Sequence, residues 1–494
     1  MPLVHRPIYL SGVIINVKNR FCLAAVFCVF SALSTTTFAA PVNLQPHSCH
    51  LPGYDQPLRC QTVPVPLDYQ HPSGEKIMLH VAVAPSFRES AKPDPLFILT
   101  GGPGQAASDA ISLLDSTFLK ARATRDIVFI DQRGTGLSGK LDCDIMESVA
   151  ELPLAEQETT IGACLRSLHT PFAFYTTDHS ARDIDQVRNV LGYASINVWG
   201  ISYGTRLGQA YARQFPDHLR ALILDGVAAP DQIIFAWGRD AQASLDANFK
   251  RCADDVDCKA SFPMLRQQFN TLLQQVNAGA ITLDFSHPRT ARKIKMQLVP
   301  STFLQAIRTA LYASQTSSRL PFIIDSAEKG NWGPFLAQAY TISDFSSAGP
   351  AIGLMLAVTC AEDVPRLTPA IIAEEEGNSF LAGAEVKLLP SWCRFVNVPA
   401  AKYAEATMIN TPVLLLSGAL DPVTPPRRAE AAIRHMSHAQ HFVVANAGHG
   451  VSTLGCTPKL LREFLDHPEQ TLDAACLKKI PPTPFQLGAA GPRP

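Results

Sequence analysis

The 494-residue chain lacks several patterns that would assign it to a well-defined class of protein. It has no Cys-x-x-Cys and no His-Glu-x-x-His, which excludes the common zinc ribbons, zinc fingers and metalloprotease helices. It has no long basic run, and its 42 Lys and Arg nearly balance its 43 Asp and Glu, so we expect no nucleic-acid partner. Only 17% of its residues are charged and 47% are hydrophobic, which is typical of a globular protein with a large core. The sequence predicts no metal site and no cofactor.

The first 39 residues have the composition of a secretory leader. They contain basic residues but no carboxylate, then a short apolar run from Phe21 to Leu33, and they end in a small-residue stretch that includes Thr37 and Ala39. This order predicts a signal peptide (residues 1–39) that is cut after Ala39, with small residues at −3 and −1. An uncleaved anchor helix is the alternative, although the run is shorter than the roughly 20 residues that a bilayer requires. We therefore predict export to the periplasm or the extracellular space, without stable membrane association after cleavage.

Cysteine usage agrees with export. Two of the 12 cysteines lie in the leader, and an even number remains in the mature chain, which favours disulfides. Spacing alone does not determine the pairing, and a mixture of bridges and buried free thiols is the alternative. We predict pairing between neighbours in the sequence, because short loops close most readily. The predicted pairs are Cys49–Cys60, Cys143–Cys164, Cys252–Cys258, Cys360–Cys393 and Cys456–Cys476.

Short strand-like runs alternate with helical patterns through most of the mature chain. Continuous apolar strands separated by helices predict a parallel sheet that is covered on both faces, and hence an α/β fold. The alternation stops between about residues 230 and 402 and resumes at Val413, which predicts a mainly helical cap inserted into the core. The predicted strands are 77–83, 95–99, 126–130, 196–199, 221–224, 413–416 and 441–444. The predicted divisions are 40–229 and 405–480 for the core, 230–404 for the cap and 481–494 for a disordered tail.

The sequence Gly200-Ile201-Ser202-Tyr203-Gly204 lies between a predicted strand and a predicted helix. A sharp strand-turn-helix leaves no room for side chains beside a nucleophile, so glycines flank it and the serine hydroxyl is exposed. Such a pentapeptide also arises by chance in roughly one chain in five to ten, but the flanking strand and helix favour a functional role. We predict that Ser202 is a nucleophile and that the amide of Tyr203, at a helix N-terminus, donates to an oxyanion.

A second oxyanion donor is expected in the loop after an earlier strand. The sequence Thr100-Gly101-Gly102-Pro103-Gly104 follows the apolar run that ends at Leu99. Gly102 offers a backbone N–H where a side chain would clash, whereas Pro103 has none to donate. We predict that Gly102 is the second donor; an ordinary Gly-Pro turn is the alternative.

The acid and base of a serine hydrolase of this type follow the nucleophile in the order Asp, His, each after a strand. Asp421 follows the strand that ends at Leu416, and His449 follows the next strand. We predict that His449 is the general base and that Asp421 orients it; Asp225, also at a strand end, is the alternative acid. Three further histidines with a three-residue spacing are alternative bases or a metal stripe, and we interpret them as surface residues: His435, His438 and His441.

The ordered motifs together resemble a known family. They are Gly101-Gly102-Pro103-Gly104, Asp131-Gln132-Arg133-Gly134-Thr135-Gly136, Gly200-Ile201-Ser202-Tyr203-Gly204, Asp421-Pro422 and Gly448-His449. This combination resembles the proline iminopeptidase group of α/β-hydrolases, and more closely its secreted tripeptidyl-aminopeptidase-like branch. Thr176-Thr177, Ala181-Arg182-Asp183 and Val358-Thr359-Cys360-Ala361-Glu362-Asp363 also resemble that branch. The resemblance covers most of residues 50–475, and residues 405–480 resemble its C-terminal region. One departure is Thr100, where proline iminopeptidases usually carry His.

The resemblance implies an α/β-hydrolase fold and serine exopeptidase chemistry on peptides with a free N-terminus. Family members bind the α-amine with acids of the cap, and the best-matching positions are Glu362 and Asp363, for which a solvated loop pair is the alternative. We interpret the run Glu374–Glu376 as the exposed face of a helix. Asp131 and Arg133 are candidates for an ion pair that holds the oxyanion loop, with exposed turn residues as the alternative.

Three hypotheses follow from these residues. The first is an aminopeptidase that releases N-terminal residues or short peptides. The second is an esterase or other small-acyl hydrolase on the same triad, because one fold and nucleophile serve many leaving groups. The third is a binding protein that retains a hydrolase fold, which the complete set of nucleophile, base, acid and glycine loop disfavours.

Overall fold

A computed structural model of the protein describes residues 45–143, 154–279, 281–286, 291–345, 349–377, 379–401 and 407–492. The predicted signal peptide lies outside these residues. The described residues all belong to one compact unit, Asn43–Pro494. Among them, no helix combines the length and apolar character needed to cross a bilayer.

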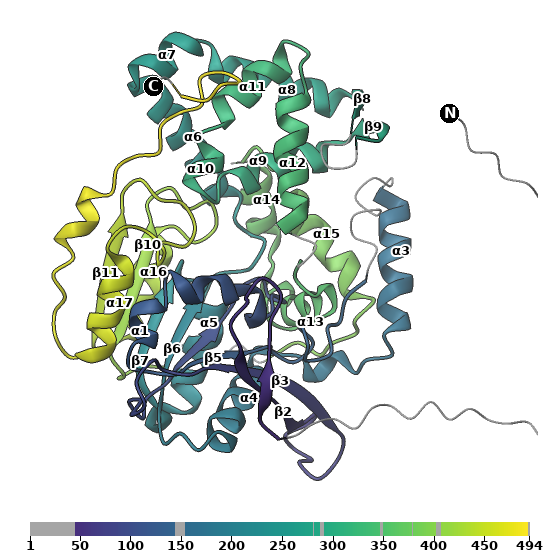
Figure 1. Ribbon diagram of the computed structural model, residues 1–494. Helices are drawn as coiled ribbons and strands as arrows, with labels where there is room; N and C mark the ends of the chain where they lie inside the picture. Colours follow the sequence, from purple (N-terminus) through teal and green to yellow (C-terminus); the bar gives the residue numbers. More distant parts are fainter. Residues whose placement is uncertain are drawn as a thin grey trace, which may run out of the picture. The chain divides into compact units, whose positions relative to one another are not determined.

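A nine-stranded mixed sheet forms the centre of this unit (Figure 1). The order of its strands is β1-β2-β3-β5-β4-β6-β7-β10-β11. Strands β5, β4, β6, β7, β10 and β11 are parallel, and β3, β2 and β1 extend the sheet beyond β5 with antiparallel pairs. The strands are β1 (His47–Cys49), β2 (Leu58–Pro66), β3 (Lys76–Ala84), β4 (Leu96–Leu99), β5 (Ile127–Ile130), β6 (Ile196–Ile201), β7 (Leu219–Asp225), β10 (Val413–Gly418) and β11 (Ala439–Val444). All seven predicted strands are present, and β1 and β2 are additional.

The central strands are continuously apolar because both faces of the sheet are covered. Alternate residues of one strand belong to different clusters: Phe97 and Leu99 of β4 pack with α4 and α5, whereas Leu96 and Ile98 pack with α1 and α17. The core helices are α1 (Leu119–Arg122), α3 (Leu154–Ser167), α4 (Thr177–Val190), α5 (Tyr203–Gln214), α16 (Pro426–Ala432) and α17 (Thr457–Asp466). Short 3₁₀ turns connect them: η1 (Ala107–Asp115), η2 (Phe172–Phe174), η3 (Pro216–His218), η5 (Ile433–His435) and η6 (Ala475–Lys479).

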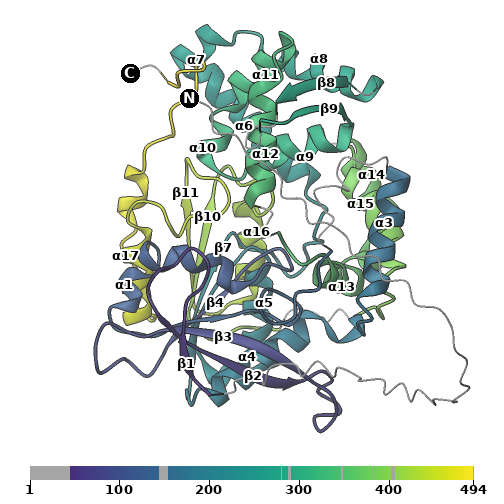
Figure 2. The same ribbon diagram turned by 45° about the vertical axis from the view of Figure 1, so that its right-hand side comes forward.

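Between β7 and β10 the chain leaves the sheet and builds the cap. Its elements are α6 (Gly238–Asp254), α7 (Val256–Ser261), α8 (Leu265–Ala278), β8 (Ile281–Ser286), β9 (Lys293–Leu298), α9 (Pro300–Ala310), α10 (Ser314–Ser317), α11 (Leu320–Glu328), α12 (Gly333–Phe345), α13 (Ile352–Glu362), η4 (Val364–Arg366), α14 (Pro369–Gly377) and α15 (Ala384–Cys393). The antiparallel hairpin of β8 and β9 is an addition to the mainly helical insertion that the sequence predicts (Figure 2).

The run Glu374–Glu376 lies in α14 but is not uniformly exposed. The Glu375 carboxylate is buried and accepts a hydrogen bond of 2.6 Å from the amide of Gly238. Glu376 lies near the surface and pairs with Lys387 at 2.6 Å. The interpretation of all three as one exposed face is therefore corrected: the middle carboxylate satisfies an amide at the start of α6.

The C-terminal residues 481–492 differ from the predicted disordered tail. They run from η6, beside the core, to the cap helices α6, α7 and α11 (Figure 1). The amide of Gln486 donates to the carbonyl of Ser318 at 3.1 Å, and Phe485 is buried. Composition predicts disorder because Pro and Gly are frequent in this stretch, but the buried ring of Phe485 and hydrogen bonds to Ser318 and Arg251 attach it to the cap.

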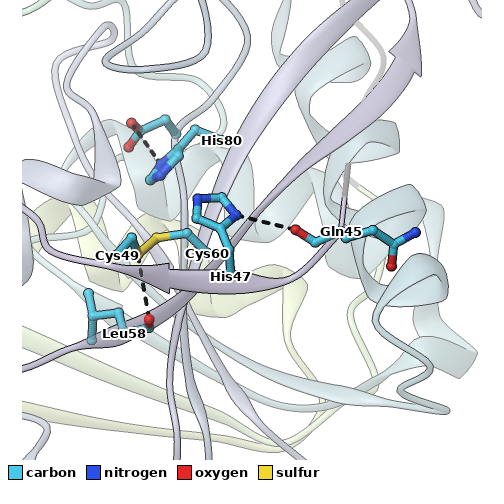
Figure 3. The surroundings of a disulfide bond; sticks show 7 residues. Gln45, His47, Cys49, Leu58, Cys60 and His80 are labelled. Carbon is cyan, nitrogen blue, oxygen red and sulfur yellow. Dashed lines mark hydrogen bonds and ion pairs between the residues drawn. A yellow bond between two sulfur atoms is a disulfide. The ribbon is translucent and has the colours of Figure 1, made fainter. Parts of the chain in front are cut away.

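Five disulfides match the pairs of sequence neighbours that the spacing predicts. They are Cys49–Cys60, Cys143–Cys164, Cys252–Cys258, Cys360–Cys393 and Cys456–Cys476. Figure 3 shows the first of them, which joins the paired strands β1 and β2 beside His47 and His80. The Cys360–Cys393 bridge links α13 to α15 within the cap.

Candidate functional site

Ser202 occupies a strained turn between β6 and α5. Its backbone has φ 57° and ψ −125°, a conformation that a non-glycine residue adopts only when its surroundings enforce it. A Cβ on Gly200 would overlap the carbonyl of Gly204, and a Cβ on Gly204 would overlap the carbonyl of Leu99. The flanking glycines therefore permit the turn to be this sharp, as the pentapeptide predicts.

The glycine loop after β4 packs directly against this turn. A Cβ on Gly101 would lie 2.8 Å from the Cβ of Ser202, so only glycine fits there. The loop is closed by the hydroxyl of Thr100, which donates to the carbonyl of Gln105 at 2.9 Å. Within the described ranges, the amides of Gly102 and Tyr203 donate to no protein acceptor. Both amides are thus available to an oxyanion at Ser202.

His449 and Asp421 form a hydrogen-bonded pair. Asp421 follows β10 and His449 follows β11, and these neighbouring parallel strands bring both residues to one edge of the sheet. The distance from His449 Nδ1 to Asp421 Oδ2 is 2.7 Å. Burial tends to raise the pKa of Asp421, but the imidazole and the amides of Thr424 and Val423 outweigh burial and lower it. Burial lowers the pKa of His449, but the Asp421 carboxylate outweighs this and raises it above its ordinary value of 6.5.

Ser202 and His449 contact the same short turn after β7. The amide of Ser202 donates to the carbonyl of Asp225 at 3.0 Å. A Cβ on the next residue, Gly226, would lie 3.0 Å from Cε1 of His449. In the part of the chain that the structure describes, the Ser202 hydroxyl makes no hydrogen bond to the imidazole. In free serine hydrolases this bond is often long and shortens when substrate binds.

The alternative acid, Asp225, has a different partner set. Its carboxylate accepts from the amides of Val451 at 2.9 Å and Ser452 at 2.8 Å. It therefore anchors the loop that follows His449 rather than the imidazole itself. Of the alternative bases, His441 lies in β11 with its ring 3.0 Å from the hydroxyl of Ser417. Across the described residues, no cluster of three or more His, Cys, Asp or Glu could hold a metal ion.

Glu362 and Asp363, the predicted binding residues for the substrate amine, both have partners inside the protein. Asp363 is fully buried and pairs with Arg206 at 3.0 Å and with Arg366 at 2.7 Å. Glu362 accepts from the amide and the hydroxyl of Thr177, both at 2.8 Å. Two acids at the end of the apolar helix α13 require partners inside the protein, because a buried unpaired charge is costly. These carboxylates join α13 to α4 and α5.

Asp131 and Arg133 do not form the expected ion pair with each other. Asp131 accepts from the amide of Ser108 at 2.8 Å and the amide of Leu137 at 2.9 Å. Arg133 pairs with Asp183 of α4 at 2.6 Å. The two side chains point to different neighbours. Asp131 still supports the oxyanion region, since Ser108 belongs to the η1 turn that follows the glycine loop.

Two residues near the His449–Asp421 pair were not predicted from the sequence. The ring of Tyr312, from the cap, packs edge-on against His449 with ring centroids 5.1 Å apart, and its carbonyl accepts from the His449 amide at 2.7 Å. The hydroxyl of Thr424 lies 2.8 Å from Asp421 Oδ2 and 2.9 Å from His449 Nδ1. No local pattern identifies Tyr312, whereas Thr424 stands only three residues after the predicted acid.

Residues 94–454 match the sequence model of a family described as alpha/beta hydrolase fold. The chain belongs to the alpha/beta hydrolase fold family. Among curated relatives, this alpha/beta hydrolase is 28% identical over 223 residues to a tripeptidyl aminopeptidase of Streptomyces coelicolor, covering 41% of each chain. It is 32% identical over 224 residues to a serine protease of Mycobacterium tuberculosis, covering 42% of each chain.

A third relative carries another peptidase name. A proline iminopeptidase of Neisseria gonorrhoeae is 31% identical over 157 residues, which cover 31% of this chain and 40% of the relative. The chain thus spans about two fifths of the length of the curated relatives it matches. Each of these three relatives carries the name of a peptidase or protease.

Proposed function

We propose that this alpha/beta hydrolase is an exported serine exopeptidase, an aminopeptidase that releases N-terminal residues or short peptides. The observation that carries the proposal is the buried His449–Asp421 pair, at 2.7 Å, against the same turn as the strained Ser202. The names of the relatives support peptides as substrates, and the resemblance of the motifs to aminopeptidases supports a free N-terminus. The five disulfides and the leader-like residues 1–39 support export to the periplasm or beyond.

In this reaction the hydroxyl of Ser202 attacks the carbonyl carbon of the scissile bond and passes its proton to Nε2 of His449. The amides of Gly102 and Tyr203 donate to the oxyanion that forms. Collapse of the tetrahedral intermediate breaks the C–N bond, and His449 returns the proton to the leaving amine. Water then hydrolyses the acyl-enzyme with the same base, and Asp421 stabilises the imidazolium in both half-reactions.

Paired substrates test the proposal with the purified mature chain. Aminoacyl and tripeptidyl naphthylamides are offered with a free or an acetylated α-amine, beside acetate and butyrate esters. We expect cleavage only where the amine is free, labelling of Ser202 by a fluorophosphonate, and a fall in rate of about 10⁴-fold or more in Ser202→Ala. The exposed Ser437→Ala serves as a matched control and retains the wild-type rate.

Two results would overturn the proposal in different ways. Far faster turnover of the esters than of any peptide substrate identifies an esterase on the same nucleophile. Failure of the fluorophosphonate to label Ser202 in folded protein means that the fold serves binding rather than hydrolysis.

A further inference from the structure

We propose that Arg308 of the cap is a positioning residue for His449: it holds Tyr312 against the imidazole and places a permanent cation beside it. The inference rests on the proposed function, in which His449 is the general base. Arg308 lies in the last turn of α9 and is 5% exposed. Tyr312 follows the C-terminal end of this helix, four residues after Arg308. Residues four apart on a helical turn are neighbours, so the two side chains can act as a pair.

Tyr312 contacts the loop of His449 through both its backbone and its ring. Its carbonyl accepts from the amide of His449 at 2.7 Å. The loop approaches so closely that a Cβ on Gly448 would overlap this carbonyl. The ring packs edge-on against the imidazole, with 5.1 Å between the ring centroids and an interplanar angle of 73°. The position of Tyr312 therefore limits the orientations that are available to the imidazole.

Arg308 holds the far end of the Tyr312 side chain. Its Nη1 donates to the phenol oxygen at 2.7 Å. The guanidinium carbon lies 4.6 Å from the ring centroid of Trp237, at the start of α6, and Nε lies 3.6 Å from Oε1 of Glu385 in α15. The indole N–H of Trp237 donates to the other oxygen of Glu385. Side chains from α6, α9 and α15 thus converge on one guanidinium, which binds the residue that packs on the base.

The charge of Arg308 is constant across the pH range of an enzyme assay. Burial lowers the pKa of Arg308, but the Glu385 carboxylate and the phenol of Tyr312 outweigh burial and raise it above its ordinary value. Burial raises the pKa of Tyr312, so the phenol stays neutral. A buried cation is retained only where it has partners, which Glu385 and the two aromatic rings supply. The effect of this charge on His449 therefore does not vary with pH.

Charged groups face His449 from the core and from the cap. Burial lowers the pKa of the imidazole, whereas the carboxylates of Asp421, after β10, and Asp225, at the end of β7, raise it. Arg308, from α9, lowers it, because a cation disfavours a second positive charge nearby. Arg308 thus partly offsets the two carboxylates, and the base stays unprotonated at a lower pH than they alone would allow.

Arg308→Met tests both parts of the inference, because methionine keeps an apolar stem of similar length but has no charge and no donor. We expect kcat on the naphthylamides to fall about tenfold with KM little changed, since the base is less well oriented. The rate at which a fluorophosphonate labels Ser202, measured from about pH 5 to about pH 9, reports the protonation of the base in the free enzyme. Its acid limb should move to higher pH, because the repulsion that lowers the pKa of His449 is gone.

Two conservative variants separate the charge from the hydrogen bond. Arg308→Lys keeps the cation, so the acid limb should return close to its wild-type position. Tyr312→Phe keeps the ring but removes the hydroxyl that Arg308 binds, so kcat should fall while the acid limb stays in place. Arg319→Met is the matched control, since Arg319 is exposed on the cap between α10 and α11, and it should change neither kcat nor the acid limb.

The outcomes distinguish failure of this inference from failure of the proposed function. If folded wild-type protein does not label at Ser202, the hydrolase mechanism is wrong and the role of Arg308 fails with it. If wild type labels but hydrolyses esters rather than peptides, the peptidase assignment is wrong, and the labelling rates still decide the role of Arg308.

The positioning role itself is wrong if folded Arg308→Met has the kcat and the acid limb of the wild type. It is also wrong if kcat falls while the acid limb stays in place, because a purely structural role gives that result. Should Arg308→Met not fold, Arg308→Gln, which removes the charge but keeps a donor, is judged by the shift of the acid limb alone.

Discussion

Two buried aspartates at neighbouring strand ends support the same histidine in different ways. Asp421 binds the imidazole of His449 directly at 2.7 Å. Asp225 instead accepts amide hydrogens from Val451 and Ser452, and so holds the backbone that leads away from His449. Burial raises the pKa of Asp225 above its ordinary value, whereas the imidazole keeps that of Asp421 low. Each carboxylate is stabilised by its own donors, which is why two acids coexist so close to one base.

The raised pKa of His449 predicts the acid side of the pH–rate profile. The general base must be unprotonated, so kcat/KM should fall about tenfold per pH unit below a pKa that lies above 6.5. Asp421→Asn removes the charge that raises this pKa, while the burial that lowers it remains, so the acid limb should move to lower pH as kcat drops. Initial rates on a tripeptidyl naphthylamide with a free α-amine, measured from about pH 5 to about pH 9, test both effects.

His441→Gln is the matched control for this profile. His441 is the third residue of β11 and contacts Ser417 rather than Asp421. Its replacement should leave the acid limb where it is. The assignment of His449 as the base is wrong if the acid limb of the pH–rate profile moves in His441→Gln. It is also wrong if the acid limb stays in place in Asp421→Asn.

At the residue scale, local sequence predicts those parts of the site that depend on local geometry. Gly200 and Gly204 identify the turn at Ser202, and strand ends identify Asp421 and His449, which the structure pairs. The role of Glu362 and Asp363 could not be predicted in the same way. Their environment is created by Arg206 of α5 and Thr177 of α4, which are distant in sequence and become neighbours only in the fold.

Helix α4 connects the sheet to the cap through buried polar contacts. Asp183 pairs with Arg133, which continues the chain after β5, and Thr177 at the start of α4 binds Glu362 at the end of α13. Arg133 also donates to the carbonyls of Leu67 at 3.0 Å and Phe174 at 2.7 Å. One guanidinium thus joins the segment after β5 to α4 and to the loops at Leu67 and Phe174.

Arg133→Met should therefore destabilise the protein strongly. Both partners of the Arg133–Asp183 pair are almost completely buried, with side-chain exposures of 0% and 3%. Removing the cation leaves an uncompensated carboxylate in the interior, which costs about 3–5 kcal/mol. Urea unfolding followed by tryptophan fluorescence and circular dichroism measures the change in the free energy of unfolding.

Lys250→Ala provides the comparison for an exposed ion pair. Lys250 pairs with Asp254 along the surface of α6, and both side chains are more than half exposed. Exposed pairs of this kind contribute little, so the free energy of unfolding should change by less than about 0.5 kcal/mol. Equal stability of Arg133→Met and wild type would show that the buried pair does not hold these loops.

At the element scale, the parallel strands were predictable because burial on both faces leaves continuous apolar runs. Strand β2 was missed since it contains Pro64 and Pro66, residues that are uncommon inside sheets. In the described sheet, β1 covers only residues 58–60 of β2, so these prolines lie on an open edge where no amide is needed. The hairpin of β8 and β9 was not predicted, although apolar and polar residues alternate in both of its strands, ITLDFS and KIKMQL.

The chain passes between the core and the cap more than once. The chain leaves the sheet after β7, builds the cap, returns at β10, and finally sends residues 481–492 back to the cap (Figure 1). Asn446 donates to the carbonyl of Ile480 at 3.4 Å on the core side. On the cap side, Gln486 binds Ser318, and the guanidinium of Arg251 lies 5.2 Å from the ring of Phe485. We call residues 481–492 the C-terminal strap.

Removal of the strap should loosen the cap while the sheet stays intact. Truncation after Ile480 removes the hydrogen bond from Gln486 to Ser318, which lies between α10 and α11, and the ring of Phe485 beside Arg251 of α6. Amide hydrogen exchange in residues 314–328 should therefore become faster, whereas exchange in β4 and β6 should not change. Since α10 follows Tyr312, which packs on His449, a looser cap should also lower kcat/KM toward peptide substrates.

The variant Phe485→Ala removes the buried ring but keeps the full length of the strap, so it tests whether the ring anchors the strap. It should reproduce most of the faster exchange in residues 314–328, because the ring is 5% exposed and supplies the apolar contact of the strap. Phe87→Ala is the matched control, because that residue is 58% exposed and its ring contacts Arg122 of α1 rather than the cap. If truncation and Phe485→Ala both leave exchange in α10 and α11 at the wild-type rate, the cap is held by its own helices and the strap contributes nothing to its closure.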